Sequence, residues 1–466
     1  MLTKPSEPRP ASYRAVLVLA APVMLGSLAQ SALYLTDSVF VGRLGQVPLA
    51  AVGLGGLLFY FLTTVGAALA VGLQVQVARR VGQGRPHAVG RLFDNTLWLS
   101  LGLAVGLALV LGLVAPALAA ALVRDAAVAD QLQAYLRTIV WALPASFGWH
   151  CVAGFCTGIG RTRQLGASMA LMTLTNVGCN YLWVWGGLGS PALGIAGSAG
   201  ATAVSEVVGL LVAGAGLLRP GLRQYYGLGQ HRPTGPAVRR LLLFAAPILG
   251  KQLVETAGWF GFFVLVGQLG SRELAVSNLV RSVYTVVSLP SLALSSAIYT
   301  LTSRYLGQGR PELIGPVVGR SVVLSLAVTL LPVGALLLWP LGVGSLFTAE
   351  AGLHQLLESV VPVLAVVLLL FAVSNILYNS LLGLGGAAVA FRIELVAIGA
   401  YLAVAAAAVY GWRLPLAGVW ASEIVYWLVL GGLASRFLRR RYRQRLPQQE
   451  WAEGEEVGLG AVVVAA

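Results

Sequence analysis

Charged residues are scarce in this sequence, and their scarcity excludes an ordinary soluble protein. Only 10% of the 466 residues are charged, whereas a typical soluble domain has about 25%. Hydrophobic residues make up 58% of the chain, and the mean hydropathy is +0.82. Twelve membrane-spanning helices of about 20 residues would need roughly 240 positions, which this composition supplies. The composition therefore predicts a protein that lies mostly within a lipid bilayer.

Cysteine and histidine are also rare, which excludes the common disulfide and metal frameworks. The three cysteines, Cys151, Cys156 and Cys179, all lie within apolar runs and form no CxxC motif. The four histidines are scattered without an HExxH pair, and there is no glycine-rich phosphate loop ending in Gly-Lys. We therefore expect neither an enzyme nor an ATPase, and no cofactor other than a coupling ion.

Acidic residues are outnumbered by basic ones, 17 against 31, but this excess does not indicate a nucleic-acid partner. Most of the Lys and Arg residues fall in alternate short loops between apolar runs, such as the segments 79–91 and 436–445. In membrane proteins such residues concentrate in cytoplasmic loops. The pattern predicts a multi-pass protein of the cytoplasmic (inner) membrane with both termini in the cytoplasm.

Apolar runs long enough to cross a bilayer as helices recur along the whole chain. The sequence predicts an all-α polytopic fold of twelve transmembrane helices. Six are expected near residues 14–41, 50–73, 92–120, 132–156, 164–187 and 193–218. Six more are expected near 238–267, 274–299, 317–341, 357–382, 391–411 and 415–436.

The two halves of the chain share one sequence pattern. AAPVMLGSLAQ aligns with AAPILGKQLVE, and the match continues without a gap from Pro22 and Pro247 to the two GQGRP segments. Because each half has six spans, both halves enter the membrane from the same side, as parallel repeats do; such repeats place the substrate path between them. We predict an N-terminal lobe over 1–230, a C-terminal lobe over 231–446 and a disordered cytoplasmic tail over 447–466.

A few acidic residues lie inside the predicted spans, namely Asp37, Glu206, Glu255 and Glu423. A charged side chain at the bilayer centre costs about 2.5–3.5 kcal/mol on insertion scales, so each acid needs a partner, a cation, water or a proton. A structural ion pair is the alternative interpretation for each. Asp37 has the hydroxyl of Tyr34 nearby in the sequence.

Polar and aromatic residues accompany two of these acids. Asn176 and Asn180 are four residues apart and share one helix face, and Thr202 adds a hydroxyl in the sixth span. Hydrogen bonding between helices is the alternative role for such an Asn pair. Glu255 precedes an aromatic run at 259–263 that begins with Trp259, and a carboxylate among aromatic faces suits a lipophilic organic cation. Lys251, four residues before Glu255, complicates this interpretation. Lys251 and Glu255 could equally form a plain salt bridge, or a pair that substrate or a proton opens.

Four segments resemble one family of transporters: AQSALYLTDSVFVGRLGQVPLAAVGLG, NVGCNYLWVWGGLGSPALGIAGSAGAT, SRELAVSNLV and SRYLGQGRPE. The chain is similar to the multidrug and toxic compound extrusion (MATE) transporters of the MOP superfamily. The resemblance implies twelve helices in two lobes arranged as a V, and exchange of Na⁺ or H⁺ for cationic drugs.

The resemblance also implies roles for individual residues. It assigns Asp37, Asn176, Asn180 and Thr202 to a cation-coupling site, with Asp37 and Asn180 as ligands if the ion is Na⁺. It places Tyr34, Lys251, Glu255, Trp259 and Asn375 in the substrate path. Asn375 stands where one branch of the family has an Asp, so we expect a second-lobe site with one acid fewer.

Together these features predict a secondary antiporter that exports lipophilic, mostly cationic organic compounds in exchange for Na⁺ or H⁺ by alternating access. Its expected partners are small organic cations and the lipid bilayer, and it is expected to be a monomer. A lipid-linked oligosaccharide flippase of the same superfamily is an alternative, which would favour a more strongly cationic central cavity. An integral-membrane enzyme is the alternative from a different class.

Overall fold

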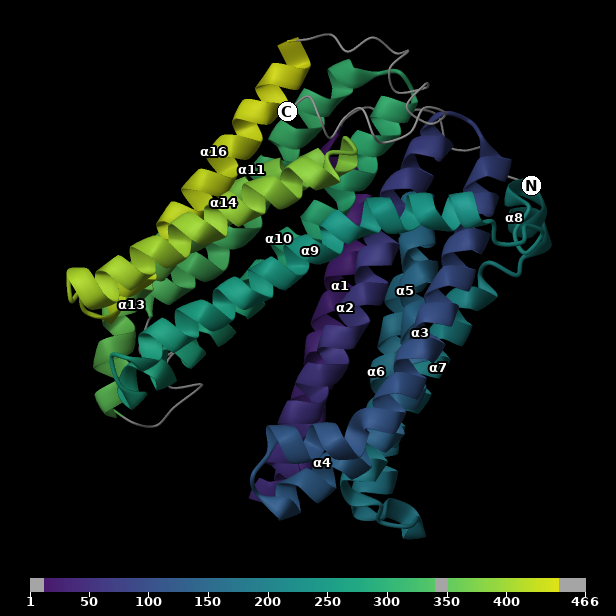
Figure 1. The fold of residues 1–466 in the computed structure, drawn as a ribbon. Helices are drawn as coiled ribbons and strands as arrows, with labels where there is room; N and C mark the ends of the chain where they lie inside the picture. The colour runs from purple at the N-terminus through teal and green to yellow at the C-terminus, as the bar shows by residue number, and fades with distance from the viewer. Residues whose placement is uncertain (1–11, 340–350, 444–466) are drawn as a thin grey trace.

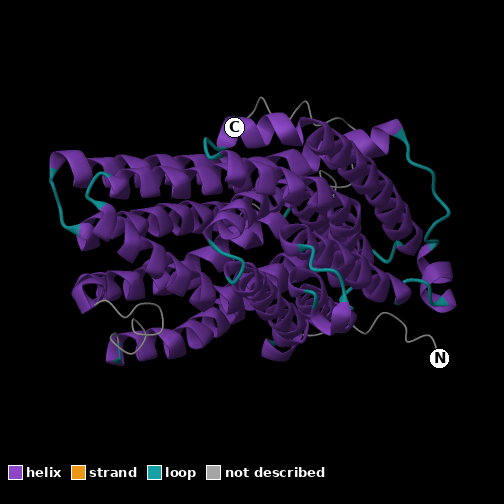
Figure 2. Ribbon diagram, turned by 90° about the horizontal axis from the view of Figure 1, so that it is seen from below, coloured by secondary structure: helices purple, strands orange, loops and turns teal. Residues whose placement is uncertain are grey.

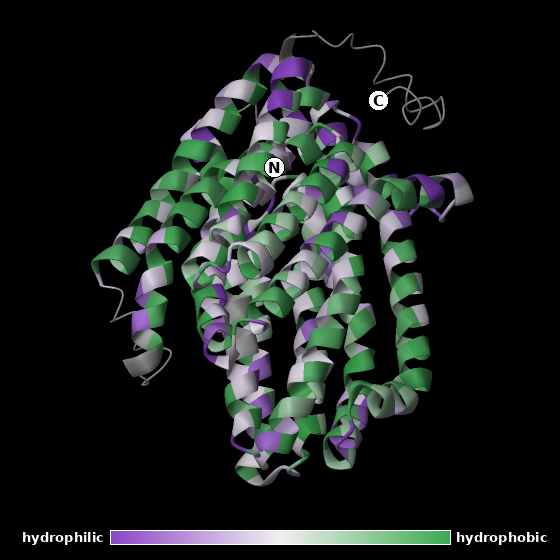
Figure 3. Ribbon diagram, turned by 60° about the vertical axis from the view of Figure 1, so that its left-hand side comes forward, coloured by the Kyte–Doolittle hydropathy of each residue, from purple (hydrophilic) through white to green (hydrophobic). Residues whose placement is uncertain are grey.

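The computed structural model describes residues 12–339 and 351–443, and this part of the chain consists of helices joined by short loops (Figure 2). No strand occurs among these residues. The predicted tail over 447–466 lies outside them. Long apolar side chains such as Leu113, Leu331 and Phe260 are exposed on the flanks. Hydrophobic residues cover much of the length of the helices in Figure 3, as expected of surfaces that face lipid.

The first lobe contains six spans. They are α1 (Tyr13–Gly42), α2 (Gln46–Gly82), α3 (Pro86–Leu122), α4 (Ala126–Ile139) with α5 (Leu143–Gly158), α6 (Arg163–Trp185) and α7 (Gly194–Ala215). The predicted span 132–156 is thus interrupted by a 3₁₀ turn at Val140–Ala142 that joins α4 to α5. A short helix, α8 (Pro220–Tyr226), follows the sixth span.

The second lobe repeats this arrangement. Its spans are α9 (Gly235–Gly267), α10 (Ser271–Gly307), α11 (Ile314–Leu338), α13 (Ala351–Gly383), α14 (Ala387–Ala406) and α15 (Leu416–Trp420) with α16 (Ser422–Arg443). Within the described residues, ten segments are long and apolar enough to cross a membrane. The 30-residue α1 and the 23-residue α6 complete the predicted twelve.

The two lobes form a V (Figure 1). Their helices lie close together at the end that carries α8 and diverge toward the end where α4 begins. The Arg-rich loops gather at the closed end: Gly82 and Gly160, which border two of them, both lie beside Arg304. The architecture is therefore the predicted two-lobed, V-shaped helical bundle.

The contact between the lobes explains why α2 and α10 extend beyond their predicted ends. A Cβ atom on Gly82 would lie 2.3 Å from the Arg304 carbonyl oxygen, and one on Gly307 would lie 2.1 Å from the Arg79 carbonyl oxygen. Gln74 Nε2 donates to Thr300 Oγ1 at 2.7 Å across the same contact. The predictions placed span ends near 73 and 299 because polar residues follow, but these residues pack against the opposite lobe.

The connection between the lobes is fixed to α3 of the first lobe. Asp94 accepts hydrogen bonds from the backbone N–H groups of Gly229 and His231, at 2.8 and 3.1 Å. The Asp94 carboxylate also lies 2.9 Å from the His231 ring nitrogen. Asn95 Oδ1 accepts from the backbone N–H of Thr234 at 3.1 Å. The predicted lobe boundary at 230/231 falls within this anchored connection.

Candidate functional site

Three helices of the first lobe bring the predicted cation-coupling residues together. Asp37 comes from α1, Asn176 and Asn180 from α6, and Thr202 from α7. Asn180 Nδ2 donates to Asp37 Oδ1 at 2.5 Å and to Asn176 Oδ1 at 3.0 Å. The Thr202 hydroxyl donates to Asp37 Oδ2 at 3.4 Å. The four side chains therefore form one hydrogen-bonded cluster.

Small residues on α7 allow this close approach. A Cβ atom on Gly197 would lie 2.4 Å from the carbonyl oxygen of Trp183 on α6, so only glycine permits the two helices to meet here. Asn176 and Asn180 then lie fully buried on the face of α6 toward α7. Asn180 Oδ1 has no hydrogen-bond partner. The cluster thus contains a buried oxygen atom with unused capacity to accept a bond.

The chemistry of the cluster is that of hard oxygen ligands. One carboxylate, two amide groups and one hydroxyl suit Na⁺, and a carboxylate removed from water can instead retain a proton. The residues present therefore fit either coupling ion. The side chain of Tyr34 lies outside the described residues, so its role stays a prediction.

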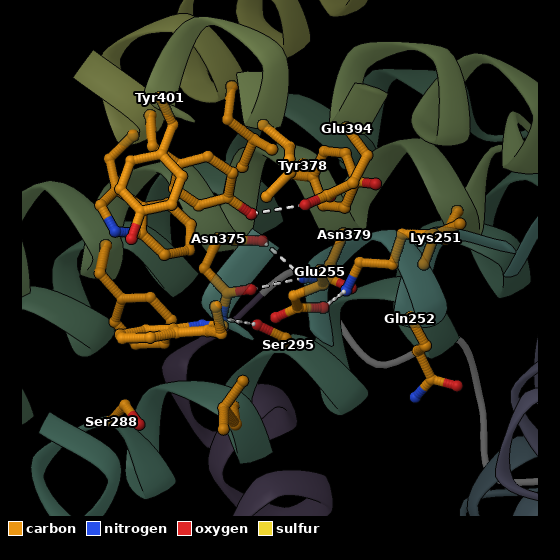
Figure 4. A pocket seen from close by; sticks show the side chains of 18 of the residues that line it. Lys251, Gln252, Glu255, Ser288, Ser295, Asn375, Tyr378, Asn379, Glu394 and Tyr401 are labelled. Carbon is orange, nitrogen blue, oxygen red and sulfur yellow. Dashed lines mark hydrogen bonds and ion pairs between the residues drawn. The ribbon is translucent and has the colours of Figure 1, made fainter. Parts of the chain in front are cut away.

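The second lobe contains a cavity of about 250 Å³. Lys251, Glu255, Trp259 and Asn375, which were predicted to contact substrate, all line it. Figure 4 shows Lys251, Glu255 and Asn375 around the cavity. Lys251 Nζ lies 2.8 Å from Glu255 Oε2, so the sequence neighbours form an ion pair on one turn of α9.

Aromatic residues form one side of this cavity. The Trp259 ring lies 5.6 Å from that of Tyr284 and 6.2 Å from that of Trp420, measured between ring centres. Phe260, next in the sequence, is 73% exposed and does not line the cavity. The aromatic contacts therefore come from several helices and not from the α9 run alone.

The cavity also contains two acids besides Glu255. Glu394 and Glu423 line it together with Glu255. Asn375, which stands where one branch of the family has an Asp, donates a hydrogen bond to Ser295 Oγ at 2.6 Å. The second lobe is therefore not poor in acids, because its carboxylates come from α14 and α16 as well as from α9.

Glu394 is the functional candidate that sequence reasoning missed. It follows Arg392 at the start of the predicted span 391–411, where an acid would be solvated at a helix end. In the structure α14 begins at Ala387, which buries Glu394 completely. Its Oε1 accepts from the Tyr426 hydroxyl at 2.6 Å, whereas Oε2 has no hydrogen-bond partner. A prediction that began this helix at Ala387 would have placed Glu394 inside the helix and away from its end.

The fold and the two interior sites define a two-lobed, all-helical membrane protein with carboxylates inside each lobe. The MatE family matches residues 22–182 and 247–406, one segment in each lobe. The chain belongs to the MatE family.

Individual relatives agree with this assignment. A probable multidrug resistance protein NorM of Pseudomonas aeruginosa is 30% identical over 443 residues, covering 92% of this chain and 88% of that protein. A second probable NorM, from Synechococcus sp., is 27% identical over 95% of this chain and 98% of that one.

Solved structures share the fold. A MOP superfamily transporter from Pyrococcus furiosus, described as having a binding pocket of reverse polarity, superposes with a TM-score of 0.86 at 21% identity. It covers 93% of this chain and 96% of its own. An outward-facing multidrug resistance MATE transporter also gives a TM-score of 0.86 at 21% identity, over 93% and 97% of the two chains.

Proposed function

We propose that this protein is a secondary antiporter that exports lipophilic, mostly cationic organic compounds in exchange for Na⁺ or H⁺. The observation that carries the proposal is the hydrogen-bonded cluster of Asp37, Asn176, Asn180 and Thr202. A carboxylate held among amide and hydroxyl groups, with one amide oxygen unpartnered, is an arrangement that a coupling ion would complete. The names of the NorM relatives support multidrug efflux.

The charges of the second-lobe cavity support a cationic substrate. Glu255, Glu394 and Glu423 line the cavity, against the single cation Lys251 among the residues that surround it. A flippase for lipid-linked oligosaccharides would be expected to carry a more strongly cationic cavity. The aromatic side chains around Trp259 add faces on which an organic cation can stack.

Alternating access would couple the two sites. The V closes at the Arg-rich end and opens at the other, and the positive-inside rule assigns the closed end to the cytoplasm. On this proposal the structure is outward-open, both termini are cytoplasmic and the location is the inner membrane. Exchange requires the coupling ion and substrate to favour different states, because a ligand with equal affinity for both shifts nothing. No cofactor beyond the ion and no protein partner is required.

Transport in proteoliposomes tests the proposal. The purified full-length protein is reconstituted, and movement of ethidium is followed under an imposed Na⁺ gradient or an imposed proton gradient. We expect uphill ethidium movement with at least one gradient. Absence of uphill ethidium movement under both gradients, or translocation of a lipid-linked sugar in place of ethidium, would contradict it.

A further inference from the structure

Lys251 places a positive charge in the second-lobe cavity where an organic cation would be expected to bind. This interpretation rests on the proposed export of organic cations. The Lys251 ammonium lies 2.8 Å from Glu255 Oε2 and 5.6 Å from the centre of the Tyr378 ring. A carboxylate and an aromatic face are the two contacts that an organic cation would make in this cavity. Lys251 therefore acts as a tethered cation that competes with the substrate for Glu255.

A second carboxylate is available to the same ammonium. Glu394 lines the same cavity as Lys251 and Glu255, and its fully buried carboxylate has one oxygen, Oε2, without a hydrogen-bond partner. Tyr378 lies next to both groups, because its hydroxyl donates to the carbonyl of Ala390, one turn before Glu394 on α14. Figure 4 shows Lys251, Glu255 and Glu394 at the same cavity. An unpartnered buried carboxylate oxygen is costly, and an ammonium donor would satisfy it.

We infer that Lys251 is an exchangeable counter-ion that moves from Glu255 to Glu394 when an organic cation binds Glu255. The number of ion pairs then rises from one to two, since substrate–Glu255 and Lys251–Glu394 replace Lys251–Glu255. Lysine carries its ammonium on a flexible four-carbon stem, which suits such a transfer. Glu394 is thus a positioning residue for Lys251, and the site selects compounds that carry both a positive charge and an aromatic or apolar surface.

Equilibrium binding of tetraphenylphosphonium to the full-length protein in nanodiscs tests the inference. Lys251→Met should tighten binding by less than about threefold when Glu394 is present, because the pair that Lys251 loses at Glu255 is replaced at Glu394, and by about threefold to tenfold in the Glu394→Gln background. Glu394→Gln preserves the acceptor for Tyr426 but leaves the displaced Lys251 without a carboxylate. It should weaken binding by about threefold to tenfold when Lys251 is present, and by less than about twofold in the Lys251→Met background.

Glu423→Gln is the matched control, because Glu423 is a buried acid of the same cavity but lies on α16, whereas the Tyr378 ring that Lys251 contacts is bonded through its hydroxyl to α14, the helix of Glu394. Its effect should be the same in both Lys251 backgrounds. Thermal unfolding of each variant reports folding, and Glu394→Asp replaces Glu394→Gln if the latter does not fold. Because the Asp side chain is one methylene shorter, Glu394→Asp should weaken binding only when Lys251 is present.

Two outcomes overturn the inference. Equal losses from Glu394→Gln in both Lys251 backgrounds would mean that Glu394 contacts the substrate directly. Unchanged binding when Lys251→Met is added to Glu394→Gln, with normal binding by the wild type, would mean that Lys251 does not compete, while leaving the proposed export intact. Binding by neither the wild type nor Lys251→Met would overturn the proposed function as well.

Discussion

The two lobes share one helical scaffold but place different chemistry at equivalent positions. Asp37 of the first lobe aligns with Phe262 of the second, and Phe262 is fully buried and stacked on Tyr401 with ring centres 5.5 Å apart. Glu255 of the second lobe aligns with Gln30 of the first. Equivalent positions of the scaffold therefore hold a carboxylate in one lobe and an aromatic ring or an amide in the other.

The comparison extends to the kind of space around the acids. In the first lobe Asp37 accepts hydrogen bonds from Asn180 and Thr202 within a compact cluster. In the second lobe Glu255 borders a cavity of about 250 Å³ with aromatic walls. A compact oxygen cluster suits a small ion, and an aromatic cavity suits an organic molecule. On the proposed function, the duplicated fold would separate ion coupling from substrate binding, and the following predictions test this division.

The largest effect is expected from Asp37→Asn. Without the carboxylate the first lobe no longer distinguishes the coupling ion in its two states, so ion-driven uphill export should fall to the passive level. Binding of tetraphenylphosphonium should remain within about twofold of wild type, because the second lobe is unchanged. Proteoliposome transport and nanodisc binding measure the two quantities.

Glu206→Gln is the matched control for this change. Glu206 is a buried acid of α7 in the same lobe, one turn beyond Thr202 and outside the hydrogen-bonded cluster. It should retain gradient-driven export. Export by Asp37→Asn at the wild-type rate would refute the assignment of Asp37 as the coupling acid.

The next largest effect is expected from Glu255→Gln. In contrast to Asp37→Asn, this change should impair cation transport and leave the ion dependence intact. Export of cations should fall by about tenfold or more through loss of charge attraction, whereas neutral substrates and ion dependence should be little affected. The lost ion pair should cost only about 1 kcal/mol of stability, because Lys251 and Glu255 are 21% and 38% exposed and water can solvate the remaining charge.

The double variant Lys251→Met/Glu255→Gln distinguishes substrate binding from a structural salt bridge. It removes both charges and should recover thermal stability without recovering cation export. Full recovery of cation export in the double variant would show that the pair has a structural role only.

Much of the fold and of the candidate sites could be predicted from the sequence. The features that could not be predicted depend on packing between helices. The repeat, the V-shaped bundle and the grouping of Asp37 with Asn176 and Asn180 followed from hydropathy, helical spacing and family resemblance. Glu394 was missed because the start of α14 depends on packing against other helices and not on local hydropathy. The contact of Gly82 with Arg304 was missed because glycines that permit close approach resemble any other loop-flanking glycine.

A smaller effect is expected at the closed end of the V, where the two lobes are in contact. Gly307→Ala would place a Cβ atom 2.1 Å from the Arg79 carbonyl oxygen, so the lobes must separate there. We expect export to slow by about tenfold as the balance between states shifts, with both ion and substrate dependence affected. Gly319→Ala is the control, since no atom lies within 4 Å of its added Cβ. Normal export by Gly307→Ala would mean that this contact does not stabilise either state.

The smallest and sharpest comparison uses an Asn pair that both lobes possess. Asn180 Nδ2 donates to Asn176 Oδ1 at 3.0 Å on α6, and Asn379 Nδ2 donates to Asn375 Oδ1 at 2.7 Å on α13. Asn180→Ala removes an oxygen ligand but leaves the charge of Asp37, so the ion concentration for half-maximal export should rise by about threefold to tenfold. Asn379→Ala removes the same group from the second lobe, and its effect should fall on the substrate concentration dependence instead. If both variants shift the ion dependence equally, the two lobes do not divide ion coupling from substrate binding.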